Sequence, residues 1–177
     1  MSAQARTTEH ISVTDLFSIG IGPSSSHTVG PMKAALHFAR TALDELHAGH
    51  GEAREPGRVV VELYGSLAAT GRGHATDRAI QWGLSGHHPR TCPDGVITGL
   101  CGQIAEEGVL HLGGEVSVPF DATRDIAFQP RTRLPQHVNG VLFRLEDTSG
   151  GTILEATYIS PGGGFVSLIP DDGTPVP

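Results

Sequence analysis

The 177 residues, of which 38% are hydrophobic, are enough for one domain-sized core, and neither length nor composition calls for a second domain. A net charge of −7, with the ten histidines counted as neutral, and the lack of a Lys/Arg cluster argue against a nucleic-acid or anionic-membrane surface. No apolar run approaches the roughly 20 residues of a membrane span, and Met1–His10 lacks the apolar core of a signal peptide, so a soluble cytoplasmic protein is expected.

The N-terminal third contains the most clearly marked helix. Residues 1–12 are expected to be flexible, and Val13–Phe17 is expected to form one helical turn. From Pro31 to His47, apolar residues recur every three or four positions, and Gly49 follows as a C-terminal stop. This pattern predicts an amphipathic helix directly after a polar segment.

The rest of the chain alternates short strands and helices. A β-branched run predicts a strand at Arg58–Tyr64, and helices are expected from the pattern around Ala79–Leu84 and, more weakly, at Ile97–Glu107. Short strands are expected at Val109–Leu112, Glu115–Phe120 and Asp125–Phe128, followed by a hairpin of Gly140–Glu146 with Thr152–Ile159 and a strand at Phe165–Leu168.

These elements predict a single α+β domain with a mixed, partly antiparallel sheet and a few helices. The 24 glycines and 12 prolines are scattered, which is typical of many turns rather than of a low-complexity linker. The domain is expected to span residues 13–168. Residues 169–177, with their acids, glycine and prolines, have the composition of a linker or a truncated end toward a further domain.

The segment Gly22–Pro31 crowds hydrogen-bond donors between two glycine-proline pairs. Its serines (Ser24, Ser25, Ser26), Thr28 and their backbone N–H groups lie just before the start of the predicted helix, where the positive end of the helix dipole favours anions. The segment therefore predicts a site for a small anion. The alternative is an ordinary polar loop with an extended helix cap.

Three histidines, His27, His74 and His137, fall in expected loops rather than on a periodic face. Imidazole titrates near neutral pH, so each is a candidate acid, base or substrate donor. Histidines in surface loops are also common without any function. Ser26 beside His27 does not predict a hydrolytic triad, because no acidic partner is identifiable.

Several cofactors are excluded by what the chain lacks. Lys33 is the sole lysine and has no surrounding cofactor motif, so a pyridoxal phosphate Schiff base is not expected, and no dinucleotide, nucleotide triphosphate, esterase or zinc-protease motif occurs. Cys92 and Cys101 are too few for an iron–sulfur cluster within this chain. Their spacing from His87 and His88 matches no standard zinc module, so no metal site is predicted.

Four blocks of sequence together resemble the β domain of iron–sulfur-dependent L-serine dehydratase, also called L-serine ammonia-lyase. The blocks are Asp15–Ala34, Tyr64–Asp77, Leu134–Gly140 and Tyr158–Val166, and they follow the order of that family over nearly the whole chain. The first two are long enough that chance agreement is not a serious competitor.

The resemblance implies a role in serine catabolism toward gluconeogenesis. In that family a second, α domain supplies the cysteines of a [4Fe–4S] cluster, so the cluster ligands would lie outside this chain. The implied reaction is β-elimination of water from L-serine to give pyruvate and ammonia, with the open iron acting on the substrate hydroxyl. The chain alone is therefore expected to be inactive.

The resemblance also implies roles for single residues. His74 would be the base for the α-proton, and His27 would bond the substrate or its leaving oxygen. The substrate carboxylate would be held by Ser24, Ser25, Ser26 and Thr28, and His137 with Asn139 would complete the polar wall. Asp77 is expected to cap the helix after the His74 segment.

Two other interpretations remain open. The family's β domain is similar to a serine- or anion-binding regulatory domain of some phosphoglycerate dehydrogenases, so the chain could sense a ligand without catalysis. Alternatively, the histidine loops could mainly contact the α domain, whether that is fused or separate. A domain with a docking face is also expected to self-associate as a dimer or another homo-oligomer.

Overall fold

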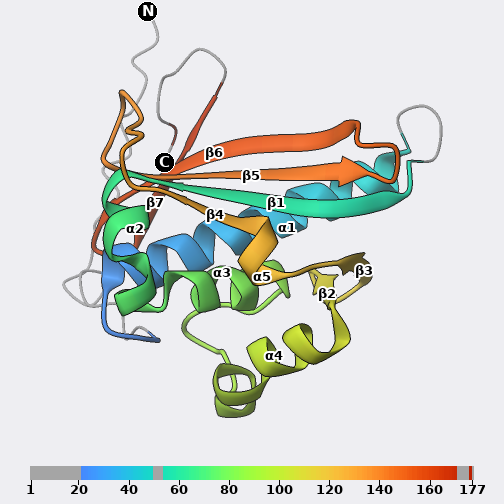
Figure 1. Ribbon diagram of the computed structural model, residues 1–177, viewed down its shortest axis with the longest axis horizontal. Coiled ribbons are helices and arrows are strands. Elements are labelled where there is room, and N and C mark those ends of the chain that lie inside the picture. Colours follow the sequence, from blue (N-terminus) through green and yellow to red (C-terminus); the bar gives the residue numbers. More distant parts are fainter. Residues whose placement is uncertain (1–20, 50–53, 171–175, 177) are drawn as a thin grey trace, which may run out of the picture.

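A mixed five-stranded sheet in the order β4-β1-β5-β6-β7 forms the centre of the computed structural model, which describes residues 21–49, 54–170 and 176 (Figure 1). Strand β4 runs parallel to β1, and every other pairing in this sheet is antiparallel. A separate hairpin pairs β2 with β3. The strands are β1 Pro56–Tyr64, β2 Val109–Leu112, β3 Val116–Pro119, β4 Ile126–Gln129, β5 Asn139–Asp147, β6 Thr152–Gly162 and β7 Phe165–Ile169. The predicted α+β class and the predicted strands are confirmed.

The helices gather on one side of the sheet (Figure 1). They are α1 Gly30–Ala48, α2 Gly65–Thr70, α3 Thr76–Leu84, α4 Asp94–Glu107 and α5 Ala122–Asp125. The long predicted helix is confirmed as α1, and it ends at Gly49, whose left-handed φ of 59° gives the expected stop. Helices α2 and α5 were not predicted, because six and four residues are too few to show a helical period.

The core lies between the sheet and α1. In β1, Val59, Val61 and Leu63 are fully buried while Val60 and Glu62 between them are only half-buried, so one face of the sheet carries the core. The Phe38 ring of α1 stacks on Phe143 of β5, with centroids 5.2 Å apart. This packing fixes α1 against the middle of the sheet.

Helix α3 lies unusually close to α1 because Gly83 has no side chain. A Cβ atom at this position would lie 2.3 Å from the Met32 carbonyl oxygen and 2.7 Å from the Ala35 Cβ. Both distances are far below ordinary contact, so only glycine fits without moving a helix. The close approach holds the C-terminal end of α3 against the first turns of α1.

A buried carboxylate joins β1 to the segment before β4. The Asp125 side chain is fully buried and lies 2.7 Å from the Arg58 Nε and 2.7 Å from an Arg124 guanidinium nitrogen. Burial alone would raise the pKa of Asp125, but the hydrogen bonds from Arg124, Asp121 and Arg58 outweigh it and lower that pKa. The carboxylate therefore stays ionised and holds the parallel strand pair.

Part of the sequence analysis concerns residues outside the described ranges. The expected turn at Val13–Phe17, the flexible residues 1–12 and most of the tail 169–177 lie there. The domain limits at 13 and 168 therefore stay a prediction.

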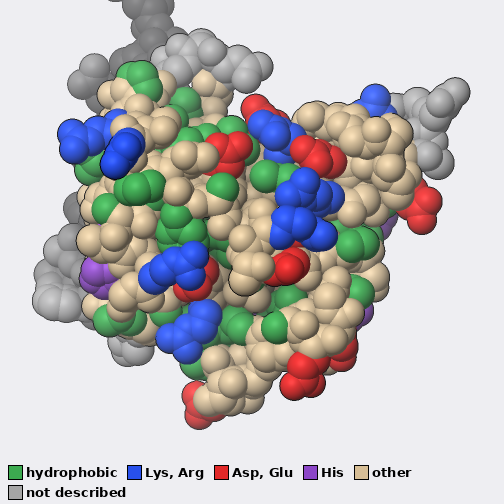
Figure 2. All heavy atoms as spheres, in the orientation of Figure 1, with side chains coloured by type: hydrophobic (Ala, Val, Ile, Leu, Met, Phe, Trp, Pro, Cys, Tyr) green, Lys and Arg blue, Asp and Glu red, His purple; other side chains and the backbone are tan. Residues whose placement is uncertain are grey.

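The surface carries charges of both signs. On the face in Figure 2, basic and acidic side chains are interspersed, and no broad area of one sign is visible. Among the described residues, no helix combines the length and apolar character that a membrane crossing requires.

Candidate functional site

The serine segment is helical, contrary to the expected loop. Ser25–Val29 forms a π-helical turn that continues directly into α1. Ser24 begins it, because the Ser24 Oγ accepts a hydrogen bond from the His27 backbone N–H at 3.1 Å. The sequence placed the helix start at Pro31, whereas the cap lies seven residues earlier, since π-turns have a period that the 3.6-residue pattern does not reveal.

Two buried threonines tie the His27 and His74 segments together. The Thr28 hydroxyl donates to the His74 carbonyl oxygen at 2.8 Å, and the Thr76 hydroxyl donates to the His27 carbonyl oxygen at 2.6 Å. Both threonines are fully buried. These reciprocal bonds hold the two imidazole rings with centroids 4.9 Å apart.

The His74 ring has one tautomer set by its surroundings. Its Nδ1 lies 3.0 Å from the Thr70 carbonyl oxygen, which can only accept a hydrogen bond. Nδ1 must therefore carry the proton, and in the neutral ring Nε2 keeps its lone pair. The next residue, Ala75, has a left-handed φ of 55°, which turns the chain sharply between the 3-10 turn Gly71–His74 and α3. Such strained backbone is found often at functional sites.

The His27 ring is engaged at both nitrogens. Its Nδ1 lies 2.9 Å from the Ser26 Oγ, and its Nε2 lies 3.1 Å from the Ser66 Oγ. Burial lowers the pKa of His27, the neighbouring His74 lowers it further, and a hydrogen bond with Ser66 acts in the opposite direction. The ring is therefore neutral at pH 7 and can either donate or accept a proton within a hydroxyl network.

Asn139 presents a buried acceptor to this region. Its Nδ2 donates to the Ser160 carbonyl oxygen at 3.1 Å, and the Ser160 Oγ donates to the Ser26 carbonyl oxygen at 2.8 Å. The carbonyl of Ser160 fixes which end of the amide faces it, so Oδ1 is the free end. This Oδ1 is buried and has no partner among the described residues. An unpaired buried acceptor costs free energy unless a ligand supplies the donor.

His137 lies beside Asn139 with the opposite tautomer from His74. The Asn139 backbone N–H donates to the His137 Nδ1 at 3.0 Å, so in the neutral ring the proton is on Nε2. The Ser66 backbone N–H donates to the Val138 carbonyl oxygen at 2.9 Å. Because the Ser66 hydroxyl also contacts the His27 Nε2, this bond connects the His137 loop to the His27 ring. In their neutral forms, the His74 ring can therefore accept a proton at Nε2, whereas the His137 ring can donate a hydrogen bond from Nε2.

The structure joins most of the predicted residues in one hydrogen-bonded cluster. The remaining serine, Ser25, is exposed on the same turn. Asp77 does not cap α3, because Ala75 occupies the cap position and the Asp77 carboxylate accepts from the Arg78 N–H instead.

Four polar residues of the cluster were not singled out from the sequence. Ser66, Thr70 and Thr76 all lie in the block Tyr64–Asp77, and Ser160 lies in the block Tyr158–Val166. The blocks were therefore the one available signal, since serine and threonine are too common to mark a site alone.

The cysteines of the chain do not fit an iron–sulfur cluster. Burial raises the pKa of Cys92 and raises that of Cys101 to about 11, and two cysteines supply only two of the four thiolates that such a cluster takes. In the described ranges, no three His, Cys, Asp or Glu side chains come close enough together to hold a metal ion. No step of the chemistry can therefore be assigned to a cluster held by these residues.

Comparison with known proteins decides the family. Residues 12–169 match the family described as serine dehydratase beta chain. This chain belongs to that family. Similar proteins include L-serine dehydratases of Streptomyces coelicolor, 46% identical over 156 residues, and of Mycobacterium bovis, 45% identical over 161 residues. The L-serine dehydratase TdcG of Escherichia coli (strain K12) is 42% identical over 158 residues.

The matches cover most of this chain but only part of each relative. They include 88% of this chain in all three cases, and 33%, 32% and 33% of the proteins from Streptomyces coelicolor, Mycobacterium bovis and Escherichia coli, respectively. The chain thus spans about a third of the length of the curated relatives it matches.

Proposed function

We propose that this serine dehydratase beta chain supplies the substrate-binding and acid–base residues for the elimination of water from L-serine. The observation that carries the proposal is the His74 ring, whose Nδ1–H is bonded to the Thr70 carbonyl and whose Nε2 is left as a base. His27 is less suited to this task, because both of its nitrogens already contact serine hydroxyls. The family and the names of the relatives support serine as the substrate.

The reaction balances with His74 as the proton acceptor. Nε2 takes the α-proton, the Cα–H electron pair forms the double bond to Cβ, and the β-hydroxyl takes up one proton and leaves as water. The protonated His74 gives up the proton it accepted, so no net proton is gained or lost. The resulting 2-aminoacrylate tautomerises to an imine, and water hydrolyses the imine to pyruvate and ammonia. A positioned general base contributes about 10²–10⁴-fold to such a step.

The other residues of the cluster hold the substrate. Side chains of the serine segment bind the carboxylate, and the Asn139 Oδ1 accepts a hydrogen bond from the substrate ammonium, which gives the buried acceptor its missing partner. The His137 Nε2–H donates to a substrate oxygen. Thr28 acts by positioning His74 rather than by touching substrate, because its buried hydroxyl is already bonded to the His74 carbonyl.

The family resemblance implies that the rest of the full enzyme completes the site. A [4Fe–4S] cluster held by cysteines of an α domain would supply Lewis-acid chemistry at the substrate hydroxyl. The α domain, fused or separate, and a second copy of the chain are the expected partners.

The test is L-serine dehydratase activity under anaerobic conditions, measured for this chain alone and together with a cluster-loaded α domain. We expect activity in the combined sample, none in the chain alone, and a loss of about 10²–10⁴-fold in His74→Ala. Added imidazole should restore part of the activity of that variant. His47→Ala is the matched control, because the His47 side chain is 65% exposed at the far end of α1.

The alternative is a serine- or anion-binding module without catalysis. It is supported by the buried Asn139 Oδ1, which has no partner among the described residues and can accept a hydrogen bond from a ligand without any chemistry. Titrating the chain alone with L-serine separates the two functions. Binding together with full activity of the combined His74→Ala sample would favour the module, whereas binding together with lost activity supports the catalytic assignment.

A further inference from the structure

A cavity lies at the other end of α3 from the histidine cluster, between α4 and the β2–β3 hairpin. It has a volume of about 200 Å³ and is lined by residues of these elements and of the turn after α3. At about 30 Å³ per water molecule, it would hold a ligand of roughly six or seven non-hydrogen atoms. None of its lining residues belongs to the histidine cluster.

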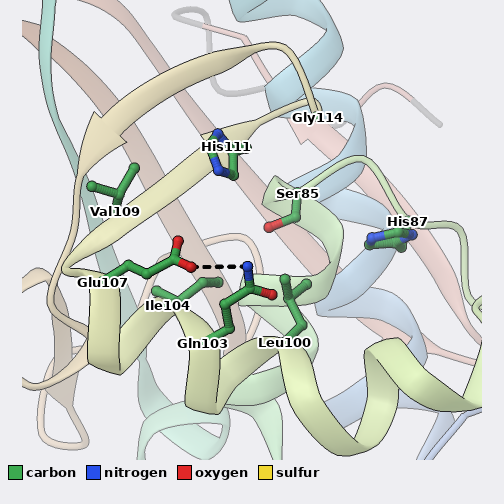
Figure 3. A pocket seen from close by; sticks show the side chains of 9 residues that line it. All are labelled: Ser85, His87, Leu100, Gln103, Ile104, Glu107, Val109, His111 and Gly114. Carbon is green, nitrogen blue, oxygen red and sulfur yellow. Dashed lines mark hydrogen bonds between the residues drawn. The ribbon is translucent and has the colours of Figure 1, made fainter.

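The cavity contains a buried polar group that has no partner in the part of the chain that the structure describes. Ser85 is 8% exposed, and its Oγ is buried without a hydrogen bond to any described residue. Figure 3 shows this hydroxyl directed into the space between the α4 side chains and the strand that carries Val109 and His111. Leaving a buried hydroxyl unpaired is unfavourable, so a ligand with a polar group would stabilise it.

The walls around Ser85 are apolar, and the rim is acidic. Leu100, Ile104 and Val109 line the body of the cavity, and Glu107 lies at its edge (Figure 3). The Glu107 carboxylate accepts one hydrogen bond from the Gln103 side chain at 3.0 Å and forms no ion pair among the described residues.

Two imidazoles, those of His87 and His111, also belong to the lining. Burial lowers the pKa of His87, which keeps that ring neutral at neutral pH. The His111 Nδ1 lies 3.1 Å from the Ser117 Oγ. The described residues that line the cavity include no Lys or Arg. A carboxylate beside an apolar cavity favours a ligand that combines a positive charge with a hydrocarbon body.

We propose that this cavity binds a small aliphatic primary amine as its ammonium form. The hydrocarbon part packs on Leu100, Ile104 and Val109, the ammonium group lies at Glu107, and Ser85 accepts a further hydrogen bond from the ligand. The proposal does not depend on the chemistry proposed at His74. The two regions lie at opposite ends of helix α3, whose nine residues span about 14 Å at 1.5 Å per residue.

The test is titration of the full ¹⁵N-labelled chain with 3-methylbutan-1-amine at pH 8, followed by amide NMR shifts. At this pH histidines of ordinary pKa are neutral, whereas an alkylamine is still charged. The uncharged 3-methylbutan-1-ol and the negatively charged 3-methylbutanoate serve as probes of the same shape. We expect saturable shifts at Ser85, Val109 and Gly114 with a dissociation constant of about 1–10 mM, typical for so few atoms.

The expected ranking is amine, then alcohol about tenfold weaker, then carboxylate without saturation. Glu107→Gln should reduce amine affinity about tenfold and leave alcohol affinity unchanged, while Ser85→Ala should weaken both about fivefold. Glu106→Gln is the matched control, because it removes the same charge one residue outside the lining.

Three results would overturn the proposal. They are an absence of saturable shifts at the cavity, equal affinity for amine and carboxylate, and an equal loss of amine affinity in Glu106→Gln and Glu107→Gln. The amide spectrum of each variant reports whether it is folded, so unfolding cannot be mistaken for lost binding.

Discussion

The packing of α3 on α1 can be tested with one chemical change made at two positions. Gly83→Ala and Gly99→Ala each add one methyl group to a helix, and each gains about 0.5–1 kcal/mol of helix propensity. At Gly99 in α4 the new Cβ meets no atom within 4 Å. At Gly83 it would lie 2.3 Å from the Met32 carbonyl oxygen, a backbone atom that cannot rotate away.

The two substitutions should therefore have opposite signs. Forcing α3 away from α1 costs about 3 kcal/mol, the upper end for overpacked cores, so Gly83→Ala should be destabilised by about 2 kcal/mol net. That corresponds to a fall in melting temperature of about 4–8 °C for a domain of this size, whereas Gly99→Ala should raise it by about 1–4 °C. Thermal unfolding followed by circular dichroism measures the melting temperature of both variants. Equal shifts in the same direction would refute the argument that Gly83 is required by helix contact.

Three further predictions follow from the buried polar groups. Thr76→Val leaves the His27 carbonyl without its donor and should lower the free energy of unfolding by about 1–3 kcal/mol in urea titrations, with a loss of activity in the combined enzyme; unchanged activity would contradict the role of this bond. In His74→Ala the pKa of His27, followed by its NMR ring signals, should rise, because one of the groups that lower it is removed, whereas His47→Ala should leave it unchanged. Asp125→Asn should cost about 3 kcal/mol by removing the charge that pairs with two arginines. Since the folded-state pKa of Asp125 is lowered, its stabilisation is full above the ordinary carboxyl pKa of 3.8 and is lost as the pH falls from there through the folded-state pKa, so wild type and Asp125→Asn should converge in acid.

Local patterns in the sequence were sufficient for most elements of the fold. The three- and four-residue spacing of α1, the β-branched run of β1 and the glycine-containing hairpin of β5 and β6 each reflect the period of one element. Short elements without a period, such as α2, were missed. This omission mattered, because the Thr70 carbonyl at the end of α2 sets the tautomer of His74.

The sequence by itself determined the family blocks, the helix of α1, the strands and the candidate residues His27, His74, His137 and Asn139, because these depend on residue identity and short-range spacing. Only the tertiary structure decided that Thr28 and Thr76 hold the two histidine segments together, that the Asn139 Oδ1 is buried with no partner among residues 21–49, 54–170 and 176, and that Ser85 lines a cavity. The physical reason is that each of these facts depends on contacts between segments far apart in the chain. Such contacts form only after the close packing of α3 on α1 and of α1 on the sheet has fixed where every buried donor and acceptor lies.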